Sequence, residues 1–301
     1  MMLTMFLLNN KNIEQKRQQI LNAIDKKMKS INIKQHLNYA KYAGPGWHKK
    51  IKRLLFAPQI VIKNKLNIFL KRRDIDFVNF NNNHDLLLNF IYNLNSLIEL
   101  ITMRFFVKTV SSNDVFYDIG AEKCLYTSLG IEFCKEIHSF EPLPEFFDIL
   151  EKRFSKYPNV YLNNIALADK TGTRMFCKAP TTLIDDVKKF YKKVSEEIEV
   201  FTTTLDEYIS HHQKPTFIKM DVEGAEHLIL KGGEKFFKNN SPIIVMEILG
   251  AEFLSNSLKA LDLLKEYGFK PFEILLDGEI KEIKYEDFLS AMDIYNYVFL
   301  K

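Results

Sequence analysis

One short stretch, residues 218–226, restricts the fold of this chain more than any other feature. An apolar run ends there at Lys219, Asp221 and Glu223, and a helical pattern follows at once. In an open α/β sheet this is the carboxyl end of a strand, where ligands bind. Because ionisable side chains are costly to bury there without a function, the stretch favours an enzyme. The structural alternative is a salt-bridged strand end whose acidic residues stabilise the start of the helix.

From residue 113 onward, short apolar runs alternate with segments of helical periodicity. The apolar runs cover residues 115–119, 137–140, 160–167, 217–220 and 243–247. The helical segments cover residues 125–133, 145–157, 223–237 and 253–267. This alternation predicts a mostly parallel sheet with helices on both faces. A further run at 199–204 predicts an added strand.

The C-terminal part departs from the alternation. Residues 272–276 and 279–283 flank Asp277-Gly278, a pair that suits the tight turn of a hairpin. Residues 295–300 form a final apolar run. We therefore expect the parallel sheet to end with an antiparallel strand near the C-terminus.

The N-terminal third is polar and mainly helical in pattern. Apolar residues at helical spacing predict a helix within 11–40, and residues 85–106 predict an amphipathic helix with Asp85 as its N-cap. Residues 43–46 predict a turn, and residues 51–73 fit either a strand or a helix. We expect a basic N-terminal region over 1–94 and a larger domain over 95–301.

The two parts of the chain carry opposite charge. Residues 1–112 contain 19 of the chain's 42 Lys+Arg residues and 6 of its 38 Asp+Glu residues. Residues 113–301 therefore contain 23 Lys+Arg and 32 Asp+Glu residues. The basic third predicts an acidic partner such as a membrane face or phosphate groups, and its Phe56, Phe69 and Phe105 add an apolar component. The alternative is a solvated basic surface that complements the acidic part.

The cysteines and the hydropathy indicate the compartment. Cys124, Cys134 and Cys177 have no C-x-x-C spacing, so we expect neither a disulfide framework nor a zinc site. The apolar start is short and lacks the features of a signal peptide, and no apolar run approaches the roughly 18 residues of a membrane helix. We expect a cytoplasmic protein, with the inner face of the membrane as a candidate contact of its basic third.

Three strand ends carry candidate ligand-binding residues. Gly120 follows the first strand and lets the backbone approach a ligand closely, beside Asp118 at the strand end. Glu141 lies roughly 20 residues after that turn, where an acid can accept both hydroxyls of a ribose. At the end of the third run, Asn164 with Ala166 and Leu167 could form an apolar slot for adenine. We interpret His138 as a hydrogen-bonded sheet residue rather than a catalyst.

These segments together resemble the FkbM family of S-adenosylmethionine-dependent methyltransferases. The resemblance covers about residues 95–300. The matching pieces appear in the family's order: Asp118-x-Gly-Ala121 with Tyr126-Thr127, Phe140-Glu-Pro142, Ala166-Leu-Ala-Asp169-Lys-x-Gly172, Thr204-Leu-Asp206, Lys219-x-Asp-Val-Glu-Gly-Ala-Glu226 and Glu247.

The resemblance implies a Rossmann-like class I methyltransferase fold, with a mostly parallel seven-stranded sheet and one antiparallel C-terminal strand. It implies S-adenosyl-L-methionine as the cofactor and O-methylation of a sugar or glycan hydroxyl, in a surface polysaccharide or a secondary metabolite. The acceptor could be lipid-linked or phosphate-rich. The residues expected to bind the cofactor are Asp118, Gly120, Ala121, Glu122, Glu141, Asn164, Ala166 and Leu167.

The same resemblance places Asp221 and Glu223 where the methyl group meets the acceptor. A hydroxyl needs a general base, and we expect Asp221 first, then Glu223 or Glu247. A divalent metal on Asp221 and Glu247 would be another way to lower the hydroxyl's pKa. No spacing demands a metal, so we predict none.

The chain departs from the family at its first turn. Where the family usually has Gly-Ala-Asn-x-Gly, this chain has Glu122 and Cys124. This departure raises an alternative function, a non-catalytic scaffold that binds a partner through the basic N-terminal region. Nucleic-acid methylation is not expected, because the strand end Lys219-Met-Asp-Val has no Pro-Pro-aromatic motif and no cysteine follows a proline.

Overall fold

A computed structural model describes residues 2–31, 82–94, 96–122, 124–178, 181–183, 196–249, 253–288 and 295–301. The turn expected at 43–46, the segment 51–73 and the residues Phe56 and Phe69 lie outside these ranges. Within them, no helix is both long enough and apolar enough to span a bilayer.

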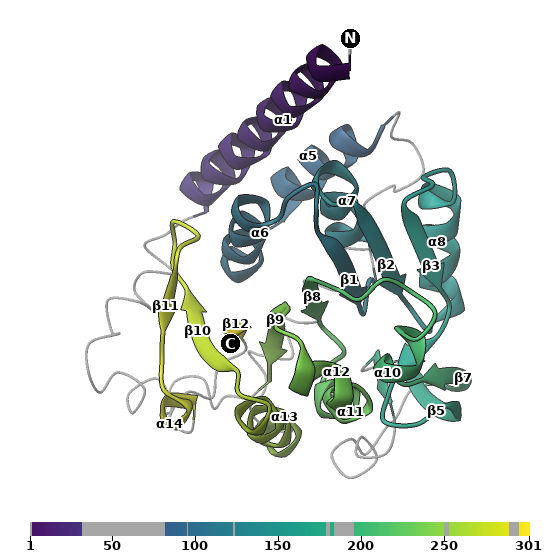
Figure 1. Cartoon of the computed structure of the whole chain (residues 1–301). Coiled ribbons are helices and arrows are strands. Elements are labelled where there is room, and N and C mark those ends of the chain that lie inside the picture. The colour runs from purple at the N-terminus through teal and green to yellow at the C-terminus, as the bar shows by residue number, and fades with distance from the viewer. Residues whose placement is uncertain are drawn as a thin grey trace.

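The centre of the fold is one large twisted sheet (Figure 1). Its eight strands are ordered β11-β10-β12-β9-β8-β1-β2-β3. Their bounds are β1 Val115–Ile119, β2 Glu136–Phe140, β3 Val160–Asn163, β8 Phe217–Met220, β9 Ile243–Ile248, β10 Lys270–Ile274, β11 Ile280–Glu282 and β12 Tyr295–Leu300.

The pairing confirms a mostly parallel sheet with an antiparallel strand near the C-terminus. The neighbours from β3 to β9 all run parallel, whereas β12 is antiparallel to both β9 and β10. The sheet has one strand more than the expected seven, because β11 pairs antiparallel with β10 as the second arm of the predicted hairpin.

Helices cover both faces of this sheet (Figure 1). One face is covered by α1 Met2–Ser30, α5 Asn83–Asn93, α6 Leu97–Thr109, α7 Leu125–Phe133 and α8 Pro144–Phe154. The other face is covered by α10 Leu205–Tyr208, α11 Glu226–Gly232, α12 Glu234–Asn239 and α13 Leu254–Glu266. The short α14 covers Tyr285–Phe288. Alternate strand residues supply the two hydrophobic clusters, since Phe116 and Phe217 belong to the first while Tyr117 and Ile218 belong to the second.

A second, four-stranded sheet leaves the main sheet after β3. Its order is β4-β7-β5-β6, with β4 Ala166–Leu167, β5 Gly172–Lys178, β6 Thr181–Leu183 and β7 Glu197–Thr203. The prediction of one strand over 160–167 was therefore wrong. The break occurs at Asn164, whose amide donates to the carbonyls of Glu141 and Pro142 and redirects the chain. The strand expected at 199–204 is found as β7, which ends one residue earlier because Thr204 caps α10.

The helix predicted over 85–106 is two helices. Asn82, rather than Asp85, caps α5, since its side chain accepts a hydrogen bond from the Asp85 amide at 2.9 Å. Ser96 caps α6 in the same way, with 3.3 Å to the Glu99 amide. The Ser96 cap satisfies the Glu99 amide, which a continuous helix would bond through its own backbone, so it marks a separate helix start.

The helix predicted over 223–237 is also divided, into α11 and α12. It starts at Glu226 rather than Glu223, because Glu223 has a φ of +52°. That left-handed conformation cannot continue a right-handed helix. Glu223 therefore belongs to a turn that faces the end of β8, which matters for the site described below.

The N-terminal helix α1 is anchored to the other helices on its face of the sheet. Its Ile20 and Ile24 are fully buried in the cluster that contains Phe106 and Phe116. The Arg17 guanidinium donates to the carbonyls of Val107 and Val110 at the end of α6. Lys16 lies 2.7 Å from the buried Glu132 carboxylate of α7. Arg17 thus satisfies carbonyls at a helix end, and Lys16 compensates the charge of a buried carboxylate.

The anchoring by Arg17 predicts a specific loss of stability. We expect Arg17→Met to lower the free energy of unfolding by about 2 kcal/mol, because two helix-terminal carbonyls lose a charged donor. Lys29→Met removes a charge from an exposed position on the same helix and should change stability by less than about 0.5 kcal/mol. Urea unfolding of the two variants measures the difference. Equal effects would contradict the anchoring role.

Candidate active site

The turn after β1 has an unusual backbone. Three of its described residues have positive φ angles: Gly120 at +85°, Glu122 at +40° and Cys124 at +64°. The amides of Gly120 and Ala121 both donate to the carbonyl of Phe140 at 3.1 Å. These bonds hold the turn against the end of β2, where the ribose-binding acid was expected.

Gly120 is required by a close contact with β8. A Cβ atom on Gly120 would lie 2.0 Å from the carbonyl oxygen of Asp221. The amide of Asp221 in turn donates to the carbonyl of Ile119 at 3.0 Å. The turn after β1 and the start of the expected catalytic segment are therefore in direct backbone contact.

Cys124 takes the backbone conformation of a glycine but directs its side chain into the protein. It is fully buried in a cluster with Phe90, Leu150 and Phe154. Its amide donates to the carbonyl of Ala121 at 2.7 Å. A non-glycine residue in this region costs about 1 kcal/mol, which burial of the side chain offsets. All three cysteines of the chain are free, buried thiols.

Glu141 presents an ordered carboxylate at the end of β2. One oxygen accepts from the Leu143 amide at 2.8 Å and the other from the Glu122 amide at 2.9 Å. The side chain is buried, and this burial raises the pKa of Glu141 to about 8. An ionised carboxylate has about four acceptor positions, so two remain for ligand hydroxyls.

Of the other residues expected to bind the cofactor, Asn164 is exposed whereas Ala166 and Leu167 are buried. The amide of Asn164 holds the loop of Glu141 through the carbonyls of Glu141 and Pro142, at 2.8 and 3.2 Å. Ala166 and Leu167 are buried in β4 and pair with Thr202 and Thr203 of β7. Leu167 belongs to the core under the sheet, whereas Ala166 packs near the second sheet.

Asp118 is buried against α7. It accepts a hydrogen bond from the Thr127 hydroxyl at 2.6 Å, and Thr127 also contacts the Ser139 hydroxyl at 2.7 Å. Burial raises the pKa of Asp118 to about 6, although Thr127 and the nearby Lys219 act in the opposite direction. Its bonds join β1, β2 and α7 beneath the turn.

The three residues expected to be catalytic lie together. Asp221, Glu223 and Glu247 are half-buried, and each offers a carboxylate oxygen within 4.8 Å of the others. Glu247 comes from β9, the strand next to β8. Three carboxylates at this spacing can bind a cation or accept protons.

A second carboxylate fixes the turn that presents Glu223. The Glu226 carboxylate accepts from the amides of Val222 and Gly224, at 3.2 and 3.4 Å. Asn256 donates to the Gly224 carbonyl at 3.1 Å. Burial raises the pKa of Glu226 to about 7. These bonds hold Glu223 in its left-handed conformation.

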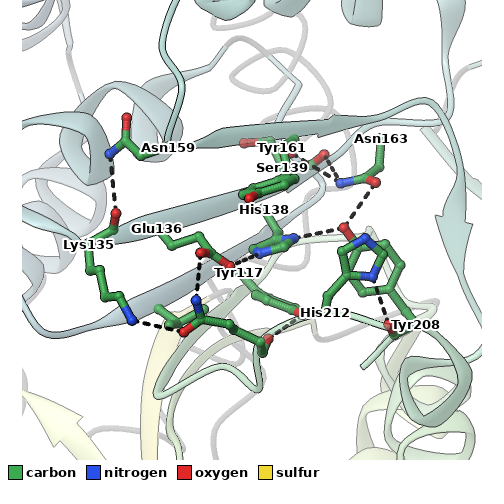
Figure 2. Close-up of polar contacts among 12 residues, drawn as sticks. Tyr117, Lys135, Glu136, His138, Ser139, Asn159, Tyr161, Asn163, Tyr208 and His212 are labelled. Carbon is green, nitrogen blue, oxygen red and sulfur yellow. Dashed lines mark hydrogen bonds and ion pairs between the residues drawn. The ribbon is translucent and has the colours of Figure 1, made fainter. Parts of the chain in front are cut away.

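On the opposite face of the sheet, His138 is part of a polar network (Figure 2). Its ring nitrogens lie 2.7 Å from the Tyr208 hydroxyl and 2.7 Å from the Glu136 carboxylate. The Tyr208 hydroxyl also donates to Asn163 at the end of β3. His138 is fully buried and stacks on Tyr161. The interpretation of His138 as a hydrogen-bonded sheet residue is confirmed.

Sequence reasoning did not assign roles to Lys219, Glu226 or Thr127. The sequence analysis singled out Lys219 with Asp221 and Glu223 as ionisable residues at a strand end, but it gave Lys219 no separate role. Lys219 is 1% exposed and lies 3.2 Å from the Asp221 carboxylate. The roles of Glu226 and Thr127 depend on contacts with distant backbone and side-chain atoms, which spacing alone does not give.

A profile described as "Methyltransferase FkbM domain" matches residues 114–271, more than half of the chain. The chain belongs to the FkbM methyltransferase family. The matched range contains the turn after β1, Glu141 and the Asp221, Glu223 and Glu247 cluster. The methyltransferase fold expected from the resemblance is confirmed.

Several solved structures are similar to this chain at low identity. A methyltransferase FkbM from Methylobacillus flagellatus is 14% identical, with a TM-score of 0.43, and the match covers 78% of this chain and 59% of that one. A precorrin-6y C5,15-methyltransferase from Geobacter metallireducens is 13% identical, with a TM-score of 0.39 and coverage of 67% and 89%.

A Streptococcus mutans protein solved in complex with SAH is 11% identical, with a TM-score of 0.38 and coverage of 69% and 99%. None of these three TM-scores reaches 0.5, so the assignment rests on the family match. A comparison with curated proteins found no match.

Family membership implies S-adenosyl-L-methionine as the cofactor, and the residues at the strand ends fit it. Glu141 offers acceptors for ribose hydroxyls, and Gly120 carries no side chain where the turn is tightest. The departure at Cys124 does not fill this edge, because its side chain lies in the cluster with Phe90 and Phe154.

The contact between Gly120 and Asp221 predicts a large effect of one methyl group. We expect Gly120→Ala to lower the free energy of unfolding by about 3 kcal/mol, since the backbone must separate. Gly268 has the same φ of +85° with no atom within 4 Å of an added Cβ, so Gly268→Ala should cost only about 1 kcal/mol. Chemical denaturation compares them, and equal losses would show that the contact is unimportant.

The raised pKa of Glu141 predicts pH-dependent binding of the cofactor product S-adenosylhomocysteine. Above about pH 8 both carboxylate oxygens are free of protons and can accept ribose hydroxyls, whereas below it the carboxyl is protonated. We expect binding to be about tenfold tighter at pH 9 than at pH 7, measured by calorimetry.

Two variants control this measurement. Glu141→Gln should bind S-adenosylhomocysteine weakly at both pH values, because it lacks the carboxylate. It should show no pH trend, because its amide does not titrate. Glu132→Gln alters a buried carboxylate on α7 that pairs with Lys16 and Asn83, and it should keep the pH trend. A trend that persists in Glu141→Gln would refute the assignment.

Proposed function

We propose that this methyltransferase transfers a methyl group from S-adenosyl-L-methionine to a hydroxyl of a sugar or glycan. The observation that carries the proposal is the carboxylate cluster of Asp221, Glu223 and Glu247, joined by backbone contact to the turn at Gly120. Carboxylates suit a hydroxyl acceptor, because they accept its hydrogen bonds and its proton.

Asp221 is the general base in this proposal. A sugar hydroxyl is a poor nucleophile until its proton is removed, and a positioned carboxylate contributes a rate factor of about 10²–10⁴. The cofactor supplies the electrophilic methyl group when bound. With the cofactor held at Gly120 and Glu141, Asp221 would accept the hydroxyl proton as the acceptor oxygen takes up the methyl group.

Glu223 and Glu247 orient the acceptor in this scheme. Both are half-buried and within 4.8 Å of Asp221 at their carboxylate oxygens, so they can accept hydrogen bonds from neighbouring hydroxyls. Rigid placement matters, because methyl transfer depends on in-line contact between two reactants. The Glu226 bonds to Val222 and Gly224 provide that rigidity around Glu223.

The acceptor is lipid-linked or rich in phosphate, and the protein works in the cytoplasm at the inner face of the membrane. The charge of the N-terminal third supports this part of the proposal, and exposed lysines of α1 such as Lys26 and Lys29 contribute to that charge. The alternative of a non-catalytic scaffold becomes the conclusion if wild-type protein fails to bind S-adenosylhomocysteine.

Substitution of the proposed base tests the reaction. We expect Asp221→Asn to lower the rate of methyl transfer by at least about 100-fold, while binding of S-adenosylhomocysteine changes little. Asp262→Asn alters an exposed acid on α13 and should leave both unchanged.

The assay screens nucleotide sugars and surface glycans for a mass gain of one methyl group. Full turnover by Asp221→Asn on an acceptor found in this way would remove Asp221 from the mechanism.

A further inference from the structure

The cluster of Asp221, Glu223 and Glu247 poses an electrostatic problem. Carboxylate oxygens within 4.8 Å of one another repel strongly when they are partly removed from water. Such a group keeps its charges only if a cation lies among them, and otherwise some of its members take up protons. The cluster therefore either has a cation beside it or is partly protonated.

Lys219 is a cation that the strand register places beside Asp221, at the edge of this cluster. Side chains alternate along a strand, so Lys219 of β8 and Asp221, which directly follows the last residue of β8, lie on the same face of the sheet. Lys219 is paired with Asp118 in the register of β1 and β8. Its ammonium lies 3.2 Å from the Asp221 carboxylate and 3.4 Å from the Met220 carbonyl.

The surroundings of Lys219 favour its charged form. The ammonium lies 5.4 Å from the centre of the Tyr126 ring, and the Tyr126 hydroxyl donates to Glu99 at 2.9 Å. Burial alone would lower the pKa of Lys219, but nearby Asp221, Glu99 and Glu247 outweigh it and hold that pKa above its ordinary value. A fully buried lysine on an apolar strand is thus compensated by acids from three elements.

We propose that Lys219 is a built-in counter-cation of the carboxylate cluster, and that it holds Asp221, Glu223 and Glu247 in place where other carboxylate clusters use a divalent metal. Lys219 acts through the carboxylates and is a positioning residue. The significance for catalysis rests on the proposed function, because Asp221 is the base only in that reaction. The electrostatic role itself does not depend on an acceptor.

The proposal predicts that removing the ammonium creates a cation site. In Lys219→Met the acids lose their compensation, so the variant should be less stable and should bind a divalent ion. We expect 5 mM MnCl₂ to raise the melting temperature of Lys219→Met by about 5 °C more than that of the wild type. The double variant Lys219→Met with Asp221→Asn should recover stability without manganese and should lose most of the manganese effect.

A matched control separates this role from the loss of any buried ion pair. Lys16→Met removes the ammonium that lies 2.7 Å from the buried Glu132 on α7. It should also lower the melting temperature, but manganese should affect it no more than the wild type. Melting in 1 mM EDTA gives the metal-free reference for each protein.

Two outcomes would overturn the proposal. In the first, manganese raises the melting temperature of the wild type as much as that of Lys219→Met, and Asp221→Asn abolishes the rise. The cluster would then be a natural metal site. The other is a failure of Asp221→Asn to restore any stability to Lys219→Met, including the case in which neither variant folds. Because no measurement here requires methyl transfer, absence of activity in the wild type would refute the proposed function and leave this result intact.

Discussion

The backbone contact between Gly120 and Asp221 is the constraint on which the rest of the site depends. A Cβ atom on Gly120 would lie 2.0 Å from the carbonyl oxygen of Asp221, so this position excludes every side chain. The cofactor turn and the proposed base are consequently set by one contact between neighbouring parallel strands. Their separation cannot change without moving β1 against β8.

Charge is organised around this contact on one face of the sheet. Asp118 of β1, Lys219 of β8 and Glu247 of β9 come from adjacent strands, and Asp221 and Glu223 follow at the end of β8. The opposite face carries the His138 network, which joins β2 and β3 to α10. The two faces thus have different roles, because one holds the acidic cluster and the other joins the ends of β2 and β3 to α10.

The sequence predicted the strands and the edge where they end, because apolar alternation and turn residues are local signals. It did not predict the division of residues 160–167 or 223–237, since those breaks depend on Asn164 bonding a distant loop and on Glu226 bonding its own turn. Asp221, Glu223 and Glu247 could be selected by type and by family resemblance. Their closeness, and the position of Lys219 among them, require the register of β8 with its neighbours, which no single strand reveals.

A crystal structure with S-adenosylhomocysteine tests the central claim most directly, because it shows whether the cofactor edge and the acidic cluster form one site. The account predicts ribose hydroxyls on the Glu141 carboxylate and the sulfur directed toward Asp221, within about 6 Å of its carboxylate so that an acceptor oxygen fits between them. A ligand bound elsewhere, or one whose sulfur faces away from Asp221, Glu223 and Glu247, would contradict it.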